Sequence, residues 1–293
     1  MAEFWQQVVS GLATGGIYAS LALALVIVYR STGVINFAQG EMATFATYLA
    51  WTFVDRGLSF WPAFALTLAA AFAGGVALER VVIRPVQGRS VLTAVIVTIG
   101  LLILINGATQ WIWGGAVRKF PSPFSTRPIH VGSAAFSIQD IGIVGLSLAA
   151  VALLTVLFRF TKVGLGLRAA AVNPDESRLV GVPVGWMLAL GWGLASALGA
   201  VSGMMVAPIV FLDPNMMQGV LLYAFAAAVL GGLTSPVGAV VGGLALGVFL
   251  NLLGTYWSTF SGDMRLVGGL AVILVVLLVR PTGLFGRPAV RRV

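Results

Sequence analysis

Nine apolar segments follow one another along most of this chain, and short polar stretches separate them. A helix needs about 20 apolar residues to cross the hydrocarbon core of a bilayer. On that criterion the pattern predicts membrane-spanning helices at about residues 5–29, 37–54, 60–80, 91–113, 140–160, 184–207, 217–233, 235–258 and 266–280. The second segment begins with the polar residues Gln39 and Glu41, so it either spans the bilayer or re-enters it. We therefore expect eight or nine transmembrane helices.

The composition leaves one fold class. Hydrophobic residues make up 59% of the 293 residues, charged residues 9%, and the mean hydropathy is +1.02. Soluble domains carry about 25% charged residues, and a transmembrane barrel shows short alternating segments instead of long apolar ones. We expect an all-α polytopic integral membrane protein with a single transmembrane domain over residues 1–293. The polar stretches at 114–139 and 161–183 are each too short to fold a core alone.

The basic residues are divided unequally between the two sides that this pattern defines. One side holds twelve, namely Arg30, Arg80, Arg84, Arg89, Arg159, Lys162, Arg168, Arg178, Arg280, Arg287, Arg291 and Arg292. The other side holds five, namely Arg56, Arg118, Lys119, Arg127 and Arg265. The positive-inside rule places the twelve in the cytoplasm, together with the C-terminus and the 161–183 loop. The 114–139 loop, with three prolines, is then external and mostly irregular, and the N-terminus is external if the second segment spans.

The cytoplasmic loop contains a short polar helix with its own start and stop signals. Asn173 is a good N-cap, and Pro174 suits the first helical position. Asp175 and Glu176 place negative charge in the first turn, and Glu176 occupies the position of a capping-box acid. Gly181 is a plausible C′ residue. About two turns of helix specified in this way beside a membrane indicate a docking element, which forms part of a coupling loop over 161–183.

Groups that could do chemistry are sparse within the apolar segments. The chain has no cysteine and a single histidine, His130, in a polar loop. There is no metal-ligand constellation and no nucleophile–base pair, so we expect no catalytic residue, cofactor or metal. Glu41 is the only acid that we expect inside a span, whereas proton- or sodium-driven carriers generally need buried acids. Because no Gly-x-x-x-x-Gly-Lys-Ser/Thr motif occurs, energy for transport must come from another polypeptide.

The remaining polar and small residues have mostly structural interpretations. Asn36, Gln39 and Glu41 form the densest polar cluster and are the first candidates for a pathway or gating element. Interhelical hydrogen bonds are nevertheless the favoured role for each neutral polar residue of the spans, namely Asn36, Gln39, Thr98, Asn106, Gln110 and Asn251. Close-packed seams are the favoured role for the spaced small residues, namely Gly11, Gly15, Gly16, Ala195, Gly199, Gly203, Gly238, Gly242, Gly243 and Gly247.

Four stretches resemble the permease subunits of bacterial ABC importers for branched-chain amino acids. They are residues 11–23 (GLATGGIYASLAL), 29–42 (YRSTGVINFAQGEM), 166–182 (GLRAAAVNPDESRLVGV) and 224–243 (AFAAAVLGGLTSPVGAVVGG). The third stretch resembles the loop that engages the ATPase. Importer permeases more broadly carry a Glu before the Ala-Ala pair, where this chain has Arg168.

The resemblance implies a bacterial inner-membrane complex. Its members would be two permease chains (the second a related subunit or another copy), two cytoplasmic ATPases and a periplasmic substrate-binding protein. The solute would be a branched-chain amino acid, although related systems carry urea, short amides or aromatic acids. The residues implied in ATPase coupling are Arg168, Asn173, Pro174, Asp175, Glu176, Arg178 and Gly181.

Three other classes of function compete with this interpretation. A secondary carrier would use Glu41 as its coupling acid, and a passive channel would carry small neutral solutes without a partner. An enzyme embedded in the membrane is the weakest alternative, because no acid–base pair is visible.

Overall fold

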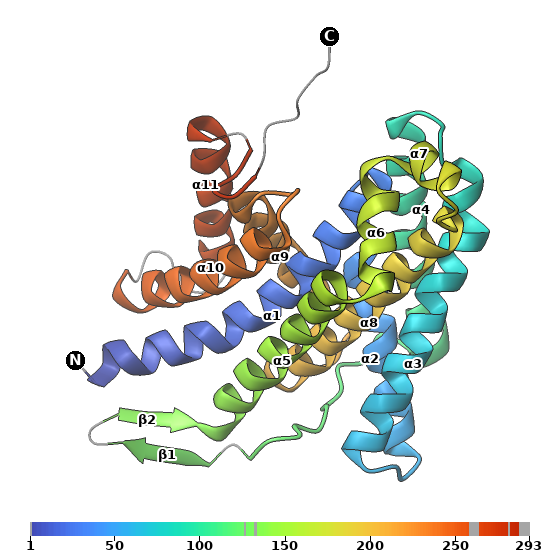
Figure 1. Ribbon diagram of the computed structural model, residues 1–293. Helices are drawn as coiled ribbons and strands as arrows, with labels where there is room; N and C mark the ends of the chain where they lie inside the picture. The colour runs from blue at the N-terminus through green and yellow to red at the C-terminus, as the bar shows by residue number, and fades with distance from the viewer. Residues whose placement is uncertain (1, 126, 132–133, 258–263, 281, 287–293) are drawn as a thin grey trace. The chain divides into compact units, whose positions relative to one another are not determined.

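The computed structural model describes residues 2–125, 127–131, 134–257, 264–280 and 282–286, which are mostly helical (Figure 1). The helices are α1 Ala2–Thr32, α2 Gln39–Asp55, α3 Phe60–Leu78, the π-helix η1 Glu79–Ile83, the 3-10 helix η2 Arg84–Val86, α4 Val91–Trp113, α5 Ile138–Phe160, α6 Lys162–Val172, α7 Pro174–Leu179, α8 Val184–Val210, α9 Met217–Gly231, α10 Pro236–Tyr256 and α11 Met264–Val279. The strands are β1 Pro128–Val131 and β2 Ala134–Ser137.

Each of the nine predicted segments contains a helix, but not each helix is long enough to cross a bilayer. Within the described residues, six are long and apolar enough, and they are Glu3–Thr32, Phe60–Val86, Val91–Trp113, Ile138–Phe160, Val184–Val210 and Pro236–Tyr256. The other three helices are shorter, with 17 residues in α2, 15 in α9 and 16 in α11. The structure therefore supports a multi-pass helical membrane protein with six candidate spans, and it does not confirm the expected count of eight or nine.

The chain divides into two compact units. The first consists of residues 1–26, 124–147 and 219–293, and it contains most of α1, the strands, the start of α5 and α9 to α11. The second consists of residues 27–123 and 148–218, and it contains α2 to α4 and α6 to α8.

In the second unit α2 is largely buried and packs against α3, α4 and α8. Close approach depends on glycines in α8, because a Cβ on Gly199 would lie 2.7 Å from the Gln39 amide nitrogen and one on Gly203 would lie 2.8 Å from the Ala43 carbonyl oxygen. Tyr48 of α2 stacks on Trp113 of α4, with ring centroids 5.2 Å apart. The predicted small-residue seam of α8 is thus a packing surface for α2.

In the first unit α1 and α10 cross at a second glycine seam. A Cβ on Gly11 would lie 2.7 Å from the Val248 Cα, and one on Gly15 would lie 2.9 Å from the Leu244 Cα. Asn251 of α10 donates to the Gln7 carbonyl oxygen of α1 at 2.7 Å. The predicted packing role of these glycines and the predicted interhelical bond of Asn251 are both confirmed.

The 114–139 segment contains one regular element that the sequence did not predict. Most of its described residues lie outside any helix or strand, as expected, but β1 and β2 pair as an antiparallel hairpin in which Ile129 lies opposite Phe136. His130 lies within β1. Pro128 stands at the first residue of β1, where the missing N–H is tolerated. The three prolines of this segment therefore do not prevent strand pairing.

Candidate functional site

The first two members of the predicted pathway cluster connect α2 to α8. Asn36 and Gln39 are fully buried, and the Asn36 amide donates to the Gln39 Oε1 at 3.0 Å. The Gln39 amide in turn donates to the Ala195 carbonyl oxygen of α8 at 2.9 Å. Buried amides need partners, and these two find them in each other and in a helix more than 150 residues away in the sequence.

The third member, Glu41, belongs to a separate polar network. Its carboxylate is buried and accepts from the Asn106 amide of α4 at 3.1 Å. The same amide nitrogen lies 3.1 Å from the Pro214 carbonyl oxygen and 3.2 Å from the Asn215 Oδ1. Gln110 donates to the Asn106 Oδ1 at 2.6 Å. We call Glu41, Asn106, Gln110 and Asn215 the Glu41 network, which joins α2, α4 and the segment after α8.

The Glu41 network has the features of a functional site in a membrane protein. Among the described residues no Lys or Arg forms an ion pair with Glu41. A buried carboxylate held by amides alone is costly to place in a membrane helix, so its presence is a pointer to function. Asn106 and Gln110 were expected in interhelical bonds, and the Asn106 bond to α2 confirms one of them. Sequence reasoning did not include Asn215, whose only local signal is its place in a polar turn.

The short polar helix of the coupling loop is α7, and its two ends are closed as the sequence predicts. The Asn173 side chain accepts from the Glu176 N–H at 3.2 Å, with Pro174 in the first turn. Gly181 has φ of 83°, its N–H donates to the Arg178 carbonyl at 3.1 Å, and the following N–H donates to the Ser177 carbonyl at 2.9 Å. These two bonds form a Schellman motif. The capping box is incomplete, because the Asn173 N–H donates to the Ala169 carbonyl oxygen of α6 at 3.1 Å rather than to the Glu176 side chain.

Exposed apolar side chains flank α7. Val172 and Val180 are each 79% exposed and Leu179 is 87% exposed, and we call these three the α7 surface. Asp175 and Arg178 pair at 2.9 Å, but both are exposed, so the pair contributes little to stability. These three side chains provide apolar area at the two ends of α7 for contact with a partner.

The remaining predicted coupling residue lies on another element. Arg168 is on α6, half-buried, and its Nε lies 3.4 Å from the Gly164 carbonyl oxygen of the same helix. It is thus separated from α7 by the break at Asn173.

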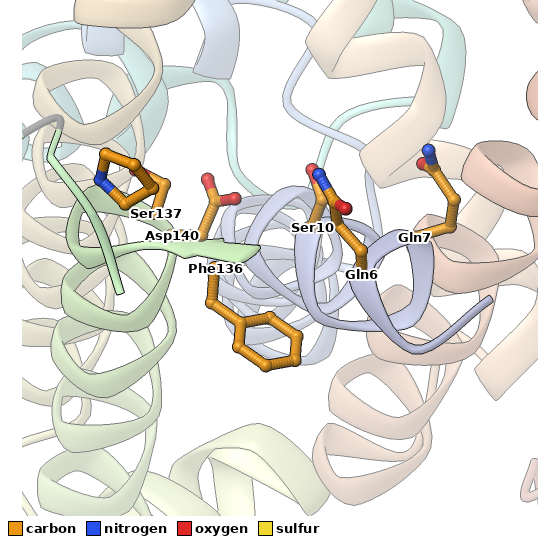
Figure 2. A pocket seen from close by; sticks show the side chains of 7 residues that line it. Gln6, Gln7, Ser10, Phe136, Ser137 and Asp140 are labelled. Atoms are coloured by element: carbon orange, nitrogen blue, oxygen red, sulfur yellow. The ribbon is translucent and has the colours of Figure 1, made fainter. Parts of the chain in front are cut away.

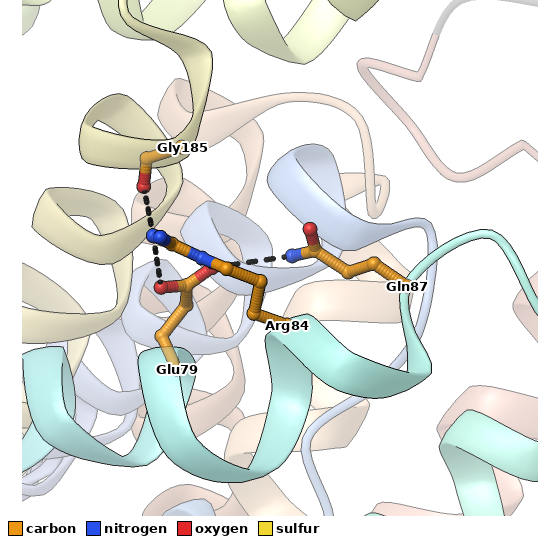
Figure 3. Close-up of polar contacts among 4 residues, drawn as sticks. All are labelled: Glu79, Arg84, Gln87 and Gly185. Carbon is orange, nitrogen blue, oxygen red and sulfur yellow. Dashed lines mark hydrogen bonds and ion pairs between the residues drawn. The ribbon is translucent and has the colours of Figure 1, made fainter.

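A third polar cluster lies where α3 ends. Figure 3 shows Glu79 of η1 and Arg84 of η2 with their side chains side by side and Gln87 approaching from the following turn. The two charged groups pair at 2.9 Å, and the Glu79 side chain is 0% exposed. Gln87 donates to Glu79 at 3.3 Å, and Arg84 donates to the Gly185 carbonyl oxygen in the first turn of α8. We call these four residues the Glu79 network.

The buried Glu79 corrects an expectation from the sequence. Glu41 is not the only acid within the apolar helices, because Glu79 lies inside the continuous span Phe60–Val86 and Asp140 lies in the first turn of α5. The predicted span ended at about residue 80, but the helix continues through η1 and η2. The Arg84 guanidinium five residues on neutralises the Glu79 charge, which is how an acid is accommodated there.

A recess of about 230 Å³ lies in the first unit and was not predicted from the sequence. Its lining residues are Gln6, Gln7, Ser10, Pro128, Phe136, Ser137 and Asp140. In Figure 2 the Asp140 carboxylate faces the recess from α5, and Ser10, Gln6 and Gln7 come from α1. None of the predicted pathway or coupling residues lines it. Among the described residues, no three His, Asp or Glu side chains are grouped as a metal site.

Comparison with known proteins identifies relatives along almost the entire chain. A family model described as branched-chain amino acid transport system / permease component matches residues 7–279. The high-affinity branched-chain amino acid transport system permease protein LivH of Salmonella typhimurium is 33% identical over 99% of this chain and 98% of its own length. The corresponding permease protein BraD of Pseudomonas aeruginosa is 30% identical with the same coverage. A xylose/arabinose import permease protein, XylH of Sulfolobus acidocaldarius, is 29% identical over 62% of this chain and 52% of its own.

Proposed function

Because this chain belongs to the permease component family of branched-chain amino acid transport systems, we propose that it is the transmembrane permease subunit of an ABC importer that moves branched-chain amino acids inward. The match to permeases along 99% of the chain is the observation that carries this proposal. On this proposal the two compact units work together as one permease domain over residues 1–293.

The energy source lies on other chains. No Walker-type motif occurs in the sequence, so ATP would be hydrolysed by separate subunits. The α7 surface supports a docking role for the 161–183 loop, because three exposed apolar side chains beside a capped helix would be buried by a partner. We propose two ATPase subunits, a second permease chain that is related or identical, and a periplasmic binding protein as partners.

The proposed location is the bacterial inner membrane, with several passes and with the C-terminus and α7 in the cytoplasm. Six candidate spans support the multi-pass arrangement. The excess of Arg and Lys on one set of loops supports the sidedness.

For the translocation pathway we propose Asn36, Gln39 and Glu41. The burial of a carboxylate with amide partners supports this role for Glu41. Because an amino acid carries a cationic ammonium group, a fixed carboxylate on the pathway would attract it. The same residue would couple protons if the chain were a secondary carrier, which is the alternative that this observation also favours.

The choice of solute rests on the family rather than on the spans. The similarity to an arabinose and xylose import permease indicates that related permeases carry chemically different solutes. Urea, short amides and aromatic acids therefore remain as alternative substrates for the same scaffold.

Reconstitution in liposomes tests the proposal. The complex of this chain with its second permease, ATPases and binding protein should take up leucine only with ATP, and uptake should persist when the proton gradient is collapsed. Leu179→Ser, which places a polar group in the α7 surface, should reduce co-purification of the ATPase at least tenfold. Ile129→Ser on the β-hairpin is the matched control and should not.

Uptake by this chain alone, or uptake abolished by an uncoupler and indifferent to ATP, would contradict an ABC permease. ATP-dependent uptake of urea or an aromatic acid but not leucine would retain the permease and replace the substrate.

A further inference from the structure

The link between α7 and α8 is short and internally hydrogen-bonded. After the Schellman motif at Gly181, only Val182 and Pro183 precede the first residue of α8. The Val184 N–H donates to the Val182 carbonyl oxygen at 2.8 Å, and the Trp186 N–H donates to the Pro183 carbonyl oxygen at 2.9 Å. With its backbone groups paired in this way, the link has little freedom to absorb a movement of α7. A displacement of α7 therefore reaches the first turn of α8.

Two arginines from the end of α3 hold that same first turn. Arg84 donates to the Gly185 carbonyl oxygen, and the Arg80 guanidinium stands over the Trp186 ring at 3.6 Å from its centroid. A guanidinium over an indole face is attracted by the ring's negative potential. The first turn of α8 thus bears two cationic contacts on consecutive residues, both made by the segment that ends α3.

Glu79 determines where the Arg84 guanidinium lies. The pair is closed at 2.9 Å around a carboxylate with no exposure, while the Arg84 side chain is 40% exposed. Arg84 therefore reaches from a partly open surface to a fixed buried charge and to the Gly185 carbonyl at once, as Figure 3 shows. A Cβ on Gly185 would lie 3.4 Å from the Arg84 guanidinium, which places this guanidinium in direct contact with the first turn of α8.

The backbone of the same segment departs from α-helix. η1 is a π-helix in which the Arg84 N–H bonds to the Glu79 carbonyl five residues back. Single π turns inside α-helices are frequent at functional sites, and they add one residue to the turn. In this chain the π turn separates Glu79 from Arg84, so these two residues of the Glu79 network are five positions apart rather than four.

We propose that the Glu79 network, with the Arg80–Trp186 stack, transmits movement of α7 to α3, so that Glu79 and Arg84 are positioning residues for ATP-driven transport. The proposal rests on the proposed function. A buried ion pair is weak evidence for stability alone, because replacing it with apolar groups is often neutral or stabilising. The Glu79 network lies between the first turn of α8, which follows α7, and the end of α3. When α7 moves the first turn of α8, the contacts of the network displace the end of α3 with it.

The test measures leucine molecules transported per ATP hydrolysed by the full complex in liposomes. Arg84→Lys keeps the charge but cannot bridge Glu79 and Gly185 with one planar group. It should lower the ratio at least fivefold while ATP hydrolysis changes less than twofold. Trp186→Leu should lower the ratio, and Trp186→Phe, which retains a ring face, should restore most of it. Val81→Ala is the matched control, because Val81 lies in η1 and is 73% exposed.

An unchanged ratio in both Arg84→Lys and Trp186→Leu would overturn the proposal and leave the network as a structural contact. Uptake by the unmutated complex distinguishes failure of the proposed function from failure of the role proposed for the Glu79 network. If the parent shows ATP-dependent uptake, the proposed function stands whatever the variants do. If it shows none, the proposed function fails and this inference falls with it.

Discussion

Single glycines show at the residue scale how closely the helices of this chain approach one another, because a Cβ at these positions would collide with the neighbouring helix. Gly74 and Gly75 are neighbours in α3, yet a Cβ on Gly75 would lie 2.6 Å from the Trp192 carbonyl oxygen, while one on Gly74 would have no atom within 4 Å. Two adjacent residues of α3 thus lie on different sides of the helix, with Gly75 packed against α8 and Gly74 open. Close approach of backbones replaces the hydrophobic driving force that membrane helices lack.

We expect Gly75→Ala to destabilise the protein by about 1–3 kcal/mol, because overpacking forces α3 away from α8. Gly74→Ala should be neutral or slightly stabilising, since alanine has the better helix propensity and the position is open. Thermal unfolding of the purified chain in detergent, followed by loss of the monodisperse peak, distinguishes the two. Equal midpoints for both variants would show that the α3–α8 contact is not close.

The Asn106 amide is the second feature that matters at the residue scale, because it is the hydrogen-bond donor to the buried Glu41 carboxylate. Asn106→Ala should destabilise the chain by about 1–3 kcal/mol, the cost of leaving a buried acceptor without its donor. Gln110→Ala removes an exposed amide whose one hydrogen bond within the described residues is to Asn106, and it should cost less. The same unfolding measurement checks both, and a larger effect at Gln110 would contradict the network as described.

At the element scale, α7 owes its form to local chemistry at its two ends. Six residues are too few for a stable isolated helix, so the caps decide whether it forms. Asn173 satisfies an N-terminal N–H and Gly181 adopts the positive φ that closes the C-terminal end. Each signal lies within a few residues of the helix, which is why the sequence alone predicts α7 at nearly its observed bounds.

Asn173→Ala should destabilise α7 by about 0.5–2 kcal/mol through loss of the cap. Gly181→Ala should cost about 1–2 kcal/mol because a side chain strains the left-handed backbone. Hydrogen exchange of the amides at 176–182 should then accelerate in both variants, about 2- to 30-fold for energies of this size. Arg178→Lys, a change at an exposed side chain, is the control. Unchanged exchange in all three variants would show that α7 is held by its surroundings rather than by its caps.

At the scale of the whole molecule, the sidedness of the loops is the property on which the docking proposal depends. The chain contains no cysteine, so single introduced cysteines report position without background. Leu179→Cys should react with a membrane-impermeant maleimide in inverted vesicles but not in intact spheroplasts, and Ser125→Cys should do the reverse. Leu179 and Ser125 are both exposed, which makes their reactivities comparable.

In the same assay, the labelling of Asp55→Cys shows whether α2 spans the bilayer or re-enters it. If α2 spans the bilayer, this residue at its C-terminal end should react from the outside, as Ser125→Cys does. If α2 re-enters, it should react from the side of Leu179→Cys. Labelling of Leu179→Cys from the outside would reverse the proposed orientation.

The sequence by itself determined the class of protein, the places of the nine apolar helices and the ends of α7. These properties depend on hydrophobic length and on capping groups a few residues apart, which are local. The resemblance to permeases also came from contiguous stretches, and the comparisons support it along the chain.

Only the tertiary structure decided which polar groups meet. Glu41 finds its donor 65 residues away, and Arg84 finds the Gly185 carbonyl 101 residues away. Glu79 lies within the predicted span over residues 60–80, but its ion pair with Arg84 depends on the π turn that carries the helix past residue 80, and a hydropathy pattern does not show such a turn. Pairings of this kind depend on which helix faces pack together, and that is set by contacts distributed along whole helices rather than by any short motif.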